Sequence, residues 1–312
     1  MTMGRHAARP ATSSCVSIAH SCDRINSMDT LLTGLAIGES PRWHQSRLWF
    51  AHWGTQEIMA VDLDGKAQVM GRVPSAGTFS IDWLPDGTLL LVQAAEAKLL
   101  RQTPAGTFAV HCDLSPLSDR SWNELTVDGR GNIYLNSLCF RFGQDEFRPG
   151  IVALLTPDGT LRQVAEGIAF PNGMVITPDN STLIVAESFA GKLTGFDIQP
   201  DGSLANRRTW ADFGGPGRAG DGICLDADGA VWCTGLQDDK RLCMRVREGG
   251  EVLEQIETEL FGFACMLGGE DGKTLFICEA DWRGRDTMDA VIAERGGRVT
   301  TLRAPSAHAG YP

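Results

Sequence analysis

Four oxygen-bearing side chains stand at comparable places in the sequence, each just before or at the start of a short apolar run. They are Glu39 in "GESPRW", Asn123 in "WNELTV", Asn172 in "PNGMVI" and Asp221 in "GDGICL". A single asparagine between proline and glycine is typical of a turn, so Asn172 alone would predict no chemistry. Two carboxylates and two amides brought to one point would repel each other or stay unsatisfied unless a cation lay among them.

This set of oxygen donors predicts a site for one divalent metal ion. Oxygen-only ligands favour Ca²⁺, with Mg²⁺ and Mn²⁺ as the nearest alternatives and Zn²⁺ and Fe²⁺ as further ones, because structural zinc sites prefer Cys and His. A cation with open positions polarises a carbonyl and makes water more acidic. Asp221 is the best candidate for a general base. The chemistry expected is hydrolysis of an ester-like carbonyl.

The spacing of these residues follows an internal repeat. A unit of strand, polar turn and apolar strand occurs six times at intervals of 40 to 50 residues, for example as "SIDWLPDGTLLLVQA" and "GICLDADGAVWCTG". Most of the turns carry Gly or Asn beside Asp or Gly, as tight hairpins require. Periods of this length are typical of propeller blades with four strands.

A second hairpin follows each unit, the last one over residues 290–304 as "AVIAERGGRVTTLRA". The sequence therefore predicts an all-β fold, a six-bladed β-propeller of residues 28–312 whose four-stranded antiparallel blades surround a central channel. Residues 30–38 are similar to the blade-ending stretch 162–170, so we expect them to pair with the last blade and close the ring. The innermost strands of a propeller line its channel, and equivalent positions of the six blades should converge there.

Composition narrows the classes of function. The net charge of -11 over 312 residues repels phosphate backbones and anionic lipid, so we expect neither nucleic-acid nor membrane binding. The nine cysteines are odd in number, lack any C-x-x-C and stand mostly in apolar runs, which predicts reduced thiols and a cytoplasmic location. Residues 1–27 lack the apolar core of a secretory signal and are expected to form a disordered tail.

The loops that leave the second strand of each unit should open on the same face as the four oxygen-bearing residues. His52 in "FAHWGT" is a candidate for substrate binding or proton transfer near neutral pH. Arg148 or Arg141 is a candidate to bind a substrate carboxylate. Trp53 and Trp282 are candidates for an apolar wall. The alternatives are a hydrogen-bonded histidine at a strand end, exposed arginines, and tryptophans that pack between blades.

Four motifs, in this order, resemble the gluconolactonase family, which includes regucalcin (senescence marker protein) and luciferin-regenerating-enzyme-like proteins. The matching stretches are "GESPRW" at 38–43, "WNELTVDGRGNIYL" at 122–135, "FPNGMVITPD" at 170–179 and "GDGICLDADGAVW" at 220–232. The resemblance extends over about residues 31–304 and implies a six-bladed propeller that opens lactones.

The resemblance also implies roles for individual residues. By position, it makes Glu39, Asn172 and Asp221 metal ligands, Asp221 also the base, and Asn123 a substrate contact. Ser121 stands where an arginine often precedes that asparagine in the sugar-lactonases, which favours a lactone in general over gluconolactone.

Three hypotheses for the function remain at this point. The first is a divalent-metal-dependent lactonase that acts on a small-molecule lactone or ester. The second is an organophosphate or aryl ester hydrolase that uses the same residues. The third is a non-catalytic metal-binding propeller that serves as a scaffold. A concave site with few polar groups would favour the enzymes over the scaffold.

Overall fold

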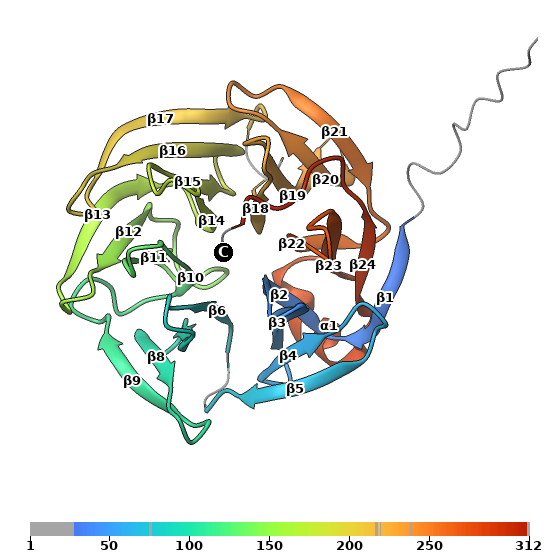
Figure 1. Cartoon of the computed structure of the whole chain (residues 1–312), viewed down its shortest axis with the longest axis horizontal. Helices are drawn as coiled ribbons and strands as arrows, with labels where there is room; N and C mark the ends of the chain where they lie inside the picture. The colour runs from blue at the N-terminus through green and yellow to red at the C-terminus, as the bar shows by residue number, and fades with distance from the viewer. Residues whose placement is uncertain (1–27, 75–76, 216–217, 219, 238, 311–312) are drawn as a thin grey trace, which may run out of the picture.

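The computed structural model describes residues 28–74, 77–215, 218, 220–237 and 239–310. Its strands form six sheets of four strands each, arranged as the blades of a ring around a central channel (Figure 1). This confirms the predicted six-bladed propeller. The tail predicted for residues 1–27 lies outside the described residues.

The first three blades follow one another along the chain, each running from the channel outward. Blade one contains β2 (Ile37–His44), β3 (Arg47–Trp53), β4 (Glu57–Val61) and β5 (Ala67–Arg72). Blade two contains β6 (Phe79–Trp83), β7 (Leu89–Gln93), β8 (Lys98–Gln102) and β9 (Phe108–Asp113). Blade three contains β10 (Trp122–Val127), β11 (Ile133–Ser137), β12 (Gly150–Leu155) and β13 (Leu161–Ile168).

The second half of the ring repeats the pattern and contains two helical elements within the described residues. Blade four contains β14 (Pro171–Ile176), β15 (Thr182–Glu187), β16 (Lys192–Ile198) and β17 (Leu204–Asp212). Blade five contains β18 (Ile223–Leu225), β19 (Val231–Gln237), β20 (Lys240–Val246) and β21 (Val252–Glu257). Blade six contains β22 (Phe261–Gly268), β23 (Thr274–Ala280), β24 (Gly297–Arg303) and β1 (Asp29–Leu35), with η1 (Arg285–Thr287) and α1 (Met288–Glu294) between β23 and β24.

The ring is closed by β1, the first strand of the described residues, as predicted. β1 pairs antiparallel with β24, from Asp29 opposite Thr301 to Leu35 opposite Gly297 (Figure 1). The last blade is thus built from both ends of the chain, and the edge of β24 is covered.

The hairpin predicted over residues 290–304 is wrong in its first half. Residues 288–294 form α1 instead of a strand, because β1 already supplies the fourth strand of blade six. Met288, Val291 and Ile292 are spaced three and four residues apart, so they share one helical face. Val291 is buried in a cluster with Ile37, and Met288 packs against it.

Asparagine and aspartate side chains shape the hairpin turns of the inner strands. Asp128 Oδ1 accepts hydrogen bonds from the backbone nitrogens of Arg130 and Asn132, at 2.9 and 2.8 Å. Gly131 has a φ of 83°, which suits glycine. The turns with glycine beside aspartate that the sequence predicts therefore form by side-chain capping of the turn.

The apolar core lies between neighbouring blades rather than in one central mass. Inner strands such as β14 are buried along their whole length, whereas outer strands such as β5 are largely exposed. Cys224, Cys243, Cys265 and Cys278 belong to one cluster between blades. Seven cysteines are free thiols in the part of the chain that the structure describes.

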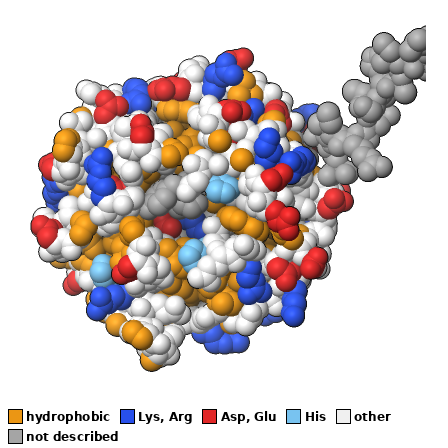
Figure 2. All heavy atoms as spheres, viewed as in Figure 1, with side chains coloured by type: hydrophobic (Ala, Val, Ile, Leu, Met, Phe, Trp, Pro, Cys, Tyr) orange, Lys and Arg blue, Asp and Glu red, His pale blue; other side chains and the backbone are white. Residues whose placement is uncertain are grey.

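The rim of the ring carries charges of both signs. Figure 2 shows acidic and basic side chains around the rim of one face.

Within the described residues, no helix is long and apolar enough to cross a membrane.

Candidate active site and metal centre

In three blades, the pairing of the innermost strand with its neighbour shifts near the start of that strand, and the shift turns the first residues toward the channel. The pairing of β2 with β3 shifts between Glu39 and Arg42, that of β10 with β11 between Trp122 and Leu125, and that of β14 with β15 between Pro171 and Met174. Such bulges are common next to active sites because they re-aim a side chain. Residues beside these positions have left-handed backbone, namely Ser40 (φ 49°), Ser121 (φ 34°) and Phe170 (φ 63°), and Gly220 before Asp221 also has a positive φ (100°).

The glycines that follow two of the predicted ligands allow neighbouring blades to come close. A Cβ on Gly173 would lie 2.6 Å from the backbone nitrogen of Ile223 and 2.7 Å from the carbonyl oxygen of Asp221. Gly222 leaves no room for a Cβ beside Ala264. Neither Gly173 nor Gly222 has a positive φ, so the glycine of "PNG" serves close packing between blades and not a turn.

The four predicted oxygen-bearing residues line one cavity at this end of the channel. The cavity has a volume of about 920 Å³, and Glu39, Asn123, Asn172 and Asp221 all contribute to its lining. These four residues come from four different blades, as the repeat predicted. Their roles as ligands, base and substrate contact stay predictions.

Hydrogen bonds set the orientation of the two asparagines. Asn123 Nδ2 donates to the Pro171 carbonyl at 3.2 Å and lies 3.4 Å from Asn172 Oδ1. Asn172 Nδ2 donates to the Ser188 hydroxyl at 3.2 Å, and that hydroxyl donates to the Gly220 carbonyl at 2.6 Å. The amide nitrogens are thus engaged with the protein, and Asn172 Oδ1 is left as the atom with spare capacity to bind a cation.

The two carboxyl groups sit in an environment that disfavours their charged forms. Burial, followed by the charges of Asp221 and Glu124, raises the pKa of Glu39 well above its usual range. Burial raises the pKa of Asp221 to about 7, against a lowering hydrogen bond from Asn172, and the charge of Glu124 adds to the rise.

A second acidic group lies beneath them in the channel, and sequence reasoning missed it. Arg42 Nη2 donates to Glu124 Oε2 at 3.3 Å and to the Leu125 carbonyl at 2.9 Å, and its Nε lies 3.7 Å from Asp82 Oδ1. Burial raises the pKa of Asp82 to about 6 even though Arg42 is near. The available signal was the acidic residue directly after Asn123 in "WNEL" and the arginine in "GESPRW".

The residues present fit a hard divalent cation. Glu39, Asp221 and Glu124 are three carboxyl groups with electrostatic effects on one another, and Arg42 is the cation that faces Glu124. A cation beside Glu39 and Asp221 would relieve that repulsion, and carboxylate and amide oxygens are the donors that Ca²⁺ and Mg²⁺ take. Within the described ranges, no three His, Cys, Asp or Glu side chains are grouped so that they could hold a metal by themselves. A metal site at Glu39 and Asp221 would therefore take the amide of Asn172 as its third ligand.

His52 is not brought to the cavity. Its Nε2 accepts a hydrogen bond from the Ala36 nitrogen at 2.9 Å, and its Nδ1 lies 2.8 Å from the Thr55 hydroxyl. The side chain is buried, and burial lowers its pKa. The imidazole therefore ties the end of β3 to the segment before β2, which corresponds to the structural alternative stated for it.

Arg148 also lies outside the cavity lining and is exposed to solvent. Arg141 lines the cavity in its place. Its guanidinium donates to the Asp145 carboxylate through Nε at 3.1 Å and Nη2 at 2.8 Å, so the charge is already paired.

The walls of the cavity are largely aromatic. Phe170 and Phe189 are stacked with ring centres 4.5 Å apart on one side. Phe263 packs edge to face with Trp53 at 6.5 Å and with Trp282 at 5.7 Å on another. All five line the cavity, so both tryptophans contribute to its wall.

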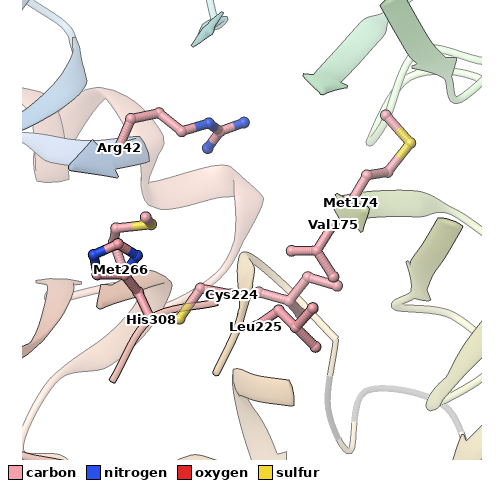
Figure 3. Close-up of a pocket in the computed structure, with 8 residues that line it drawn as sticks. Arg42, Met174, Val175, Cys224, Leu225, Met266 and His308 are labelled. Atoms are coloured by element: carbon pink, nitrogen blue, oxygen red, sulfur yellow. The ribbon is translucent and has the colours of Figure 1, made fainter. Parts of the chain in front are cut away.

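The opposite end of the channel is narrow. A small cavity of about 10 Å³ lies there among Arg42, Met174, Cys224, Met266 and His308, with Val175, Ile223 and Leu225 (Figure 3). Residues after β24 run back to the centre of the ring (Figure 1), where the backbone nitrogen of Ala309 donates to the Leu225 carbonyl at 3.1 Å. The wide cavity at the Glu39 end is thus the larger of the two openings.

Comparison with known proteins identifies a matching family and several related proteins. The family model described as "SMP-30/Gluconolactonase/LRE-like region" matches residues 37–281. Regucalcin from Xenopus laevis is 24% identical over 292 residues, which cover 88% of this chain and 95% of that protein. Diisopropyl-fluorophosphatase from Loligo vulgaris is 29% identical over 119 residues, which cover 34% of this chain and 37% of that protein.

Among solved structures, a gluconolactonase from Xanthomonas campestris superimposes with a TM-score of 0.70 and 21% identity over 89% of each chain, a likeness of fold. The family match extends over most of the chain, and the chain therefore belongs to the SMP-30/gluconolactonase/LRE-like family.

Proposed function

We propose that the protein is a divalent-metal-dependent lactonase, with Glu39, Asn172 and Asp221 as the residues that hold the cation and Ca²⁺ as its first candidate. The observation that carries the proposal is the convergence of two buried carboxyls and two amides, from four blades, on one cavity. Membership of a family whose name includes gluconolactonase supports a lactone as the substrate.

A divalent cation at this site supplies Lewis acidity to a substrate carbonyl and to water. Asn123, at the surface of the cavity, positions the lactone ring of the substrate through its amide. The Asp221 carboxylate accepts a proton from water as the water oxygen adds to the carbonyl carbon. The ring carbon–oxygen bond then breaks, the proton returns to the departing alkoxide oxygen, and the product is an open-chain hydroxy acid.

A second candidate is an organophosphate or aryl ester hydrolase that uses the same residues. The similarity to diisopropyl-fluorophosphatase over 119 residues favours it. The non-catalytic scaffold has less support, because a deep concave cavity suits a small molecule better than a flat contact between proteins.

The proposal is tested by metal analysis followed by assays on lactones and on a paraoxon-like phosphotriester. Metal-free protein should be inactive and recover on addition of Ca²⁺ or another divalent ion. Asp221→Asn and Asn172→Ala should each lose at least about 100-fold in kcat/KM on lactones, which is in the range typical of lost general-base and ligand groups. Asp158→Asn, in an exposed hairpin turn, is the matched control and should keep full activity.

Unchanged lactone opening in both site variants would refute the mechanism. Turnover of the phosphotriester alone would replace the lactonase with the second candidate. No cation binding and no turnover of either substrate would favour the scaffold. The buried, free thiols are consistent with the cytoplasmic location that we also propose.

A further inference from the structure

Two aromatic walls flank the predicted ligands. The phenylalanine wall consists of Phe142, Phe170 and Phe189. The tryptophan wall consists of Trp53, Phe263 and Trp282, extended by Met288 and Ile292 of α1. All eight side chains line the same cavity as Glu39 and Asp221.

The phenylalanine wall is tied to Asn172 through both chain and hydrogen bonds. Phe170 precedes Asn172 by two residues. Ser188, which accepts the bond from Asn172 Nδ2, donates its backbone nitrogen to the Phe170 carbonyl at 3.1 Å and directly precedes Phe189. A group bound beside the Asn172 amide therefore lies next to the stacked rings of Phe170 and Phe189.

The tryptophan wall is tied to Asp221 in the same manner. The backbone nitrogen of Gly222, next to Asp221, donates to the Phe263 carbonyl at 2.8 Å. Trp53 donates its indole Nε1 to the Phe79 carbonyl at 2.8 Å, so it presents its ring and not a free donor to the cavity. The two walls thus border the reactive groups on the Asn172 side and on the Asp221 side.

The amide nitrogens and the hydroxyl next to the predicted ligands are already hydrogen-bonded within the protein. Asn123 Nδ2 is bonded to the Pro171 carbonyl and the Ser188 hydroxyl to the Gly220 carbonyl. Arg141 is paired with Asp145. A polyhydroxylated ring would place several hydroxyl groups against aromatic faces, and each hydroxyl removed from water without a partner is unfavourable.

We infer that the substrate carries a bulky apolar group, aryl or branched alkyl, that lies between the phenylalanine wall and the tryptophan wall while its carbonyl faces Asn172 and Asp221. The position of the substrate carbonyl rests on the proposed function. The position of the apolar group rests on the phenylalanine wall and the tryptophan wall. A volume of about 920 Å³ is at the upper end of the range for drug-sized ligands, so the cavity is larger than an unsubstituted lactone ring requires.

The first test compares the holoprotein on unsubstituted γ-butyrolactone, its phenyl- and isobutyl-substituted forms, and gluconolactone. The substituted lactones should exceed both others by at least about tenfold in kcat/KM. Phe189→Ser and Trp282→Ser, one from each wall, should each reduce the ratio of phenyl-substituted to unsubstituted rates by about tenfold, since an aromatic contact of this kind contributes on that order. Phe189→Leu should restore most of the ratio, and Val110→Ser, exposed on β9 and outside the cavity lining, should keep it.

The second test measures binding without turnover. A phenyl-substituted γ-lactam keeps the carbonyl and resists opening. By calorimetry it should bind at least about tenfold more tightly than unsubstituted γ-lactam, with a negative heat-capacity change, and Phe189→Ser should remove the difference.

The outcomes separate the inference from the proposed function. Faster opening of gluconolactone or of the unsubstituted lactone would overturn the inference and leave the lactonase standing. If no lactone is opened, the proposed function fails and the lactam decides: a preference for the phenyl form supports the apolar ligand, whereas equal binding of the two lactams overturns it.

Discussion

Asn172 donates a hydrogen bond from its Nδ2 atom to the hydroxyl of Ser188, 3.2 Å away, and this pair links β14 to the turn after β15 in blade four, beside the predicted metal site. The Ser188 hydroxyl donates onward to Gly220, the residue before Asp221. One hydroxyl thus holds an amide ligand and the segment of a carboxylate ligand in a common arrangement.

Ser188→Ala should lower the affinity for Ca²⁺ by about tenfold, because loss of a group that orients a ligand typically costs 10- to 100-fold. Ser188→Thr, which keeps the hydroxyl, should restore most of it. Titration calorimetry on metal-free protein measures both. An unchanged dissociation constant in Ser188→Ala would show that the hydroxyl does not position Asn172.

Glu187 should contribute a pH-dependent part of the stability. Burial alone would raise its pKa, but hydrogen bonds from the Ala169 nitrogen and the Thr194 hydroxyl, together with Lys192 and Arg207, outweigh it and lower the pKa. A depressed folded pKa stabilises the fold above the unfolded pKa of about 4.3, and this contribution is lost as pH falls through the lower folded pKa.

Glu187→Gln should therefore reduce the free energy of unfolding at pH 7 by about 1–3 kcal/mol and lose less stability than wild type between pH 5 and pH 3. Urea unfolding at a series of pH values measures this. A parallel pH dependence of the two proteins would contradict the assignment.

The buried ion pair of Asp226 and Arg245 should be a strong stability determinant. Arg245 Nε donates to Asp226 Oδ2 at 2.6 Å, and both side chains are almost inaccessible to water. Asp226→Ala should cost about 3–5 kcal/mol in urea unfolding, because it leaves a buried guanidinium without its main partner. Asp228→Ala removes an exposed partner of the same arginine and should cost at most about 1 kcal/mol. Equal losses in the two variants would show that burial does not decide the strength of this pair.

Closure of the ring by β1 should be required for stability. Removing residues 1–35 exposes the edge of β24, and we expect a fall in the melting temperature of at least about 10 °C together with aggregation in light scattering. Removing residues 1–27 alone is the matched control and should leave the melting temperature unchanged. Equal melting temperatures for the two truncated chains would show that β1 does not close the ring thermodynamically.

The sequence was sufficient to predict the propeller because hairpins are local and their spacing is regular. The ring then places Glu39, Asn123, Asn172 and Asp221 together from four distant segments. α1 was missed because a short apolar run such as "AVIA" suits a strand or a helix, and the distant β1 decides between them by taking the strand's place.

The missed and misplaced site residues also have physical explanations. Glu124 was missed because a bulge directs two adjacent residues inward, whereas regular alternation would hide one of them. His52 lies at the predicted strand end, but its ring turns to the backbone of Ala36 and not to the cavity. The phenylalanine wall comes from loops between strands, whose paths depend on contacts with other parts of the ring.

The central claim is that a divalent cation held by Glu39, Asn172 and Asp221 enables lactone opening. The most direct measurement is the rate of lactone opening, followed by pH-stat, as metal-free protein is titrated with Ca²⁺. The rate should rise from background and saturate at one equivalent in wild type, while Asp221→Asn stays at background throughout. A full rate in excess chelator, or an equal rate in Asp221→Asn, would contradict the claim.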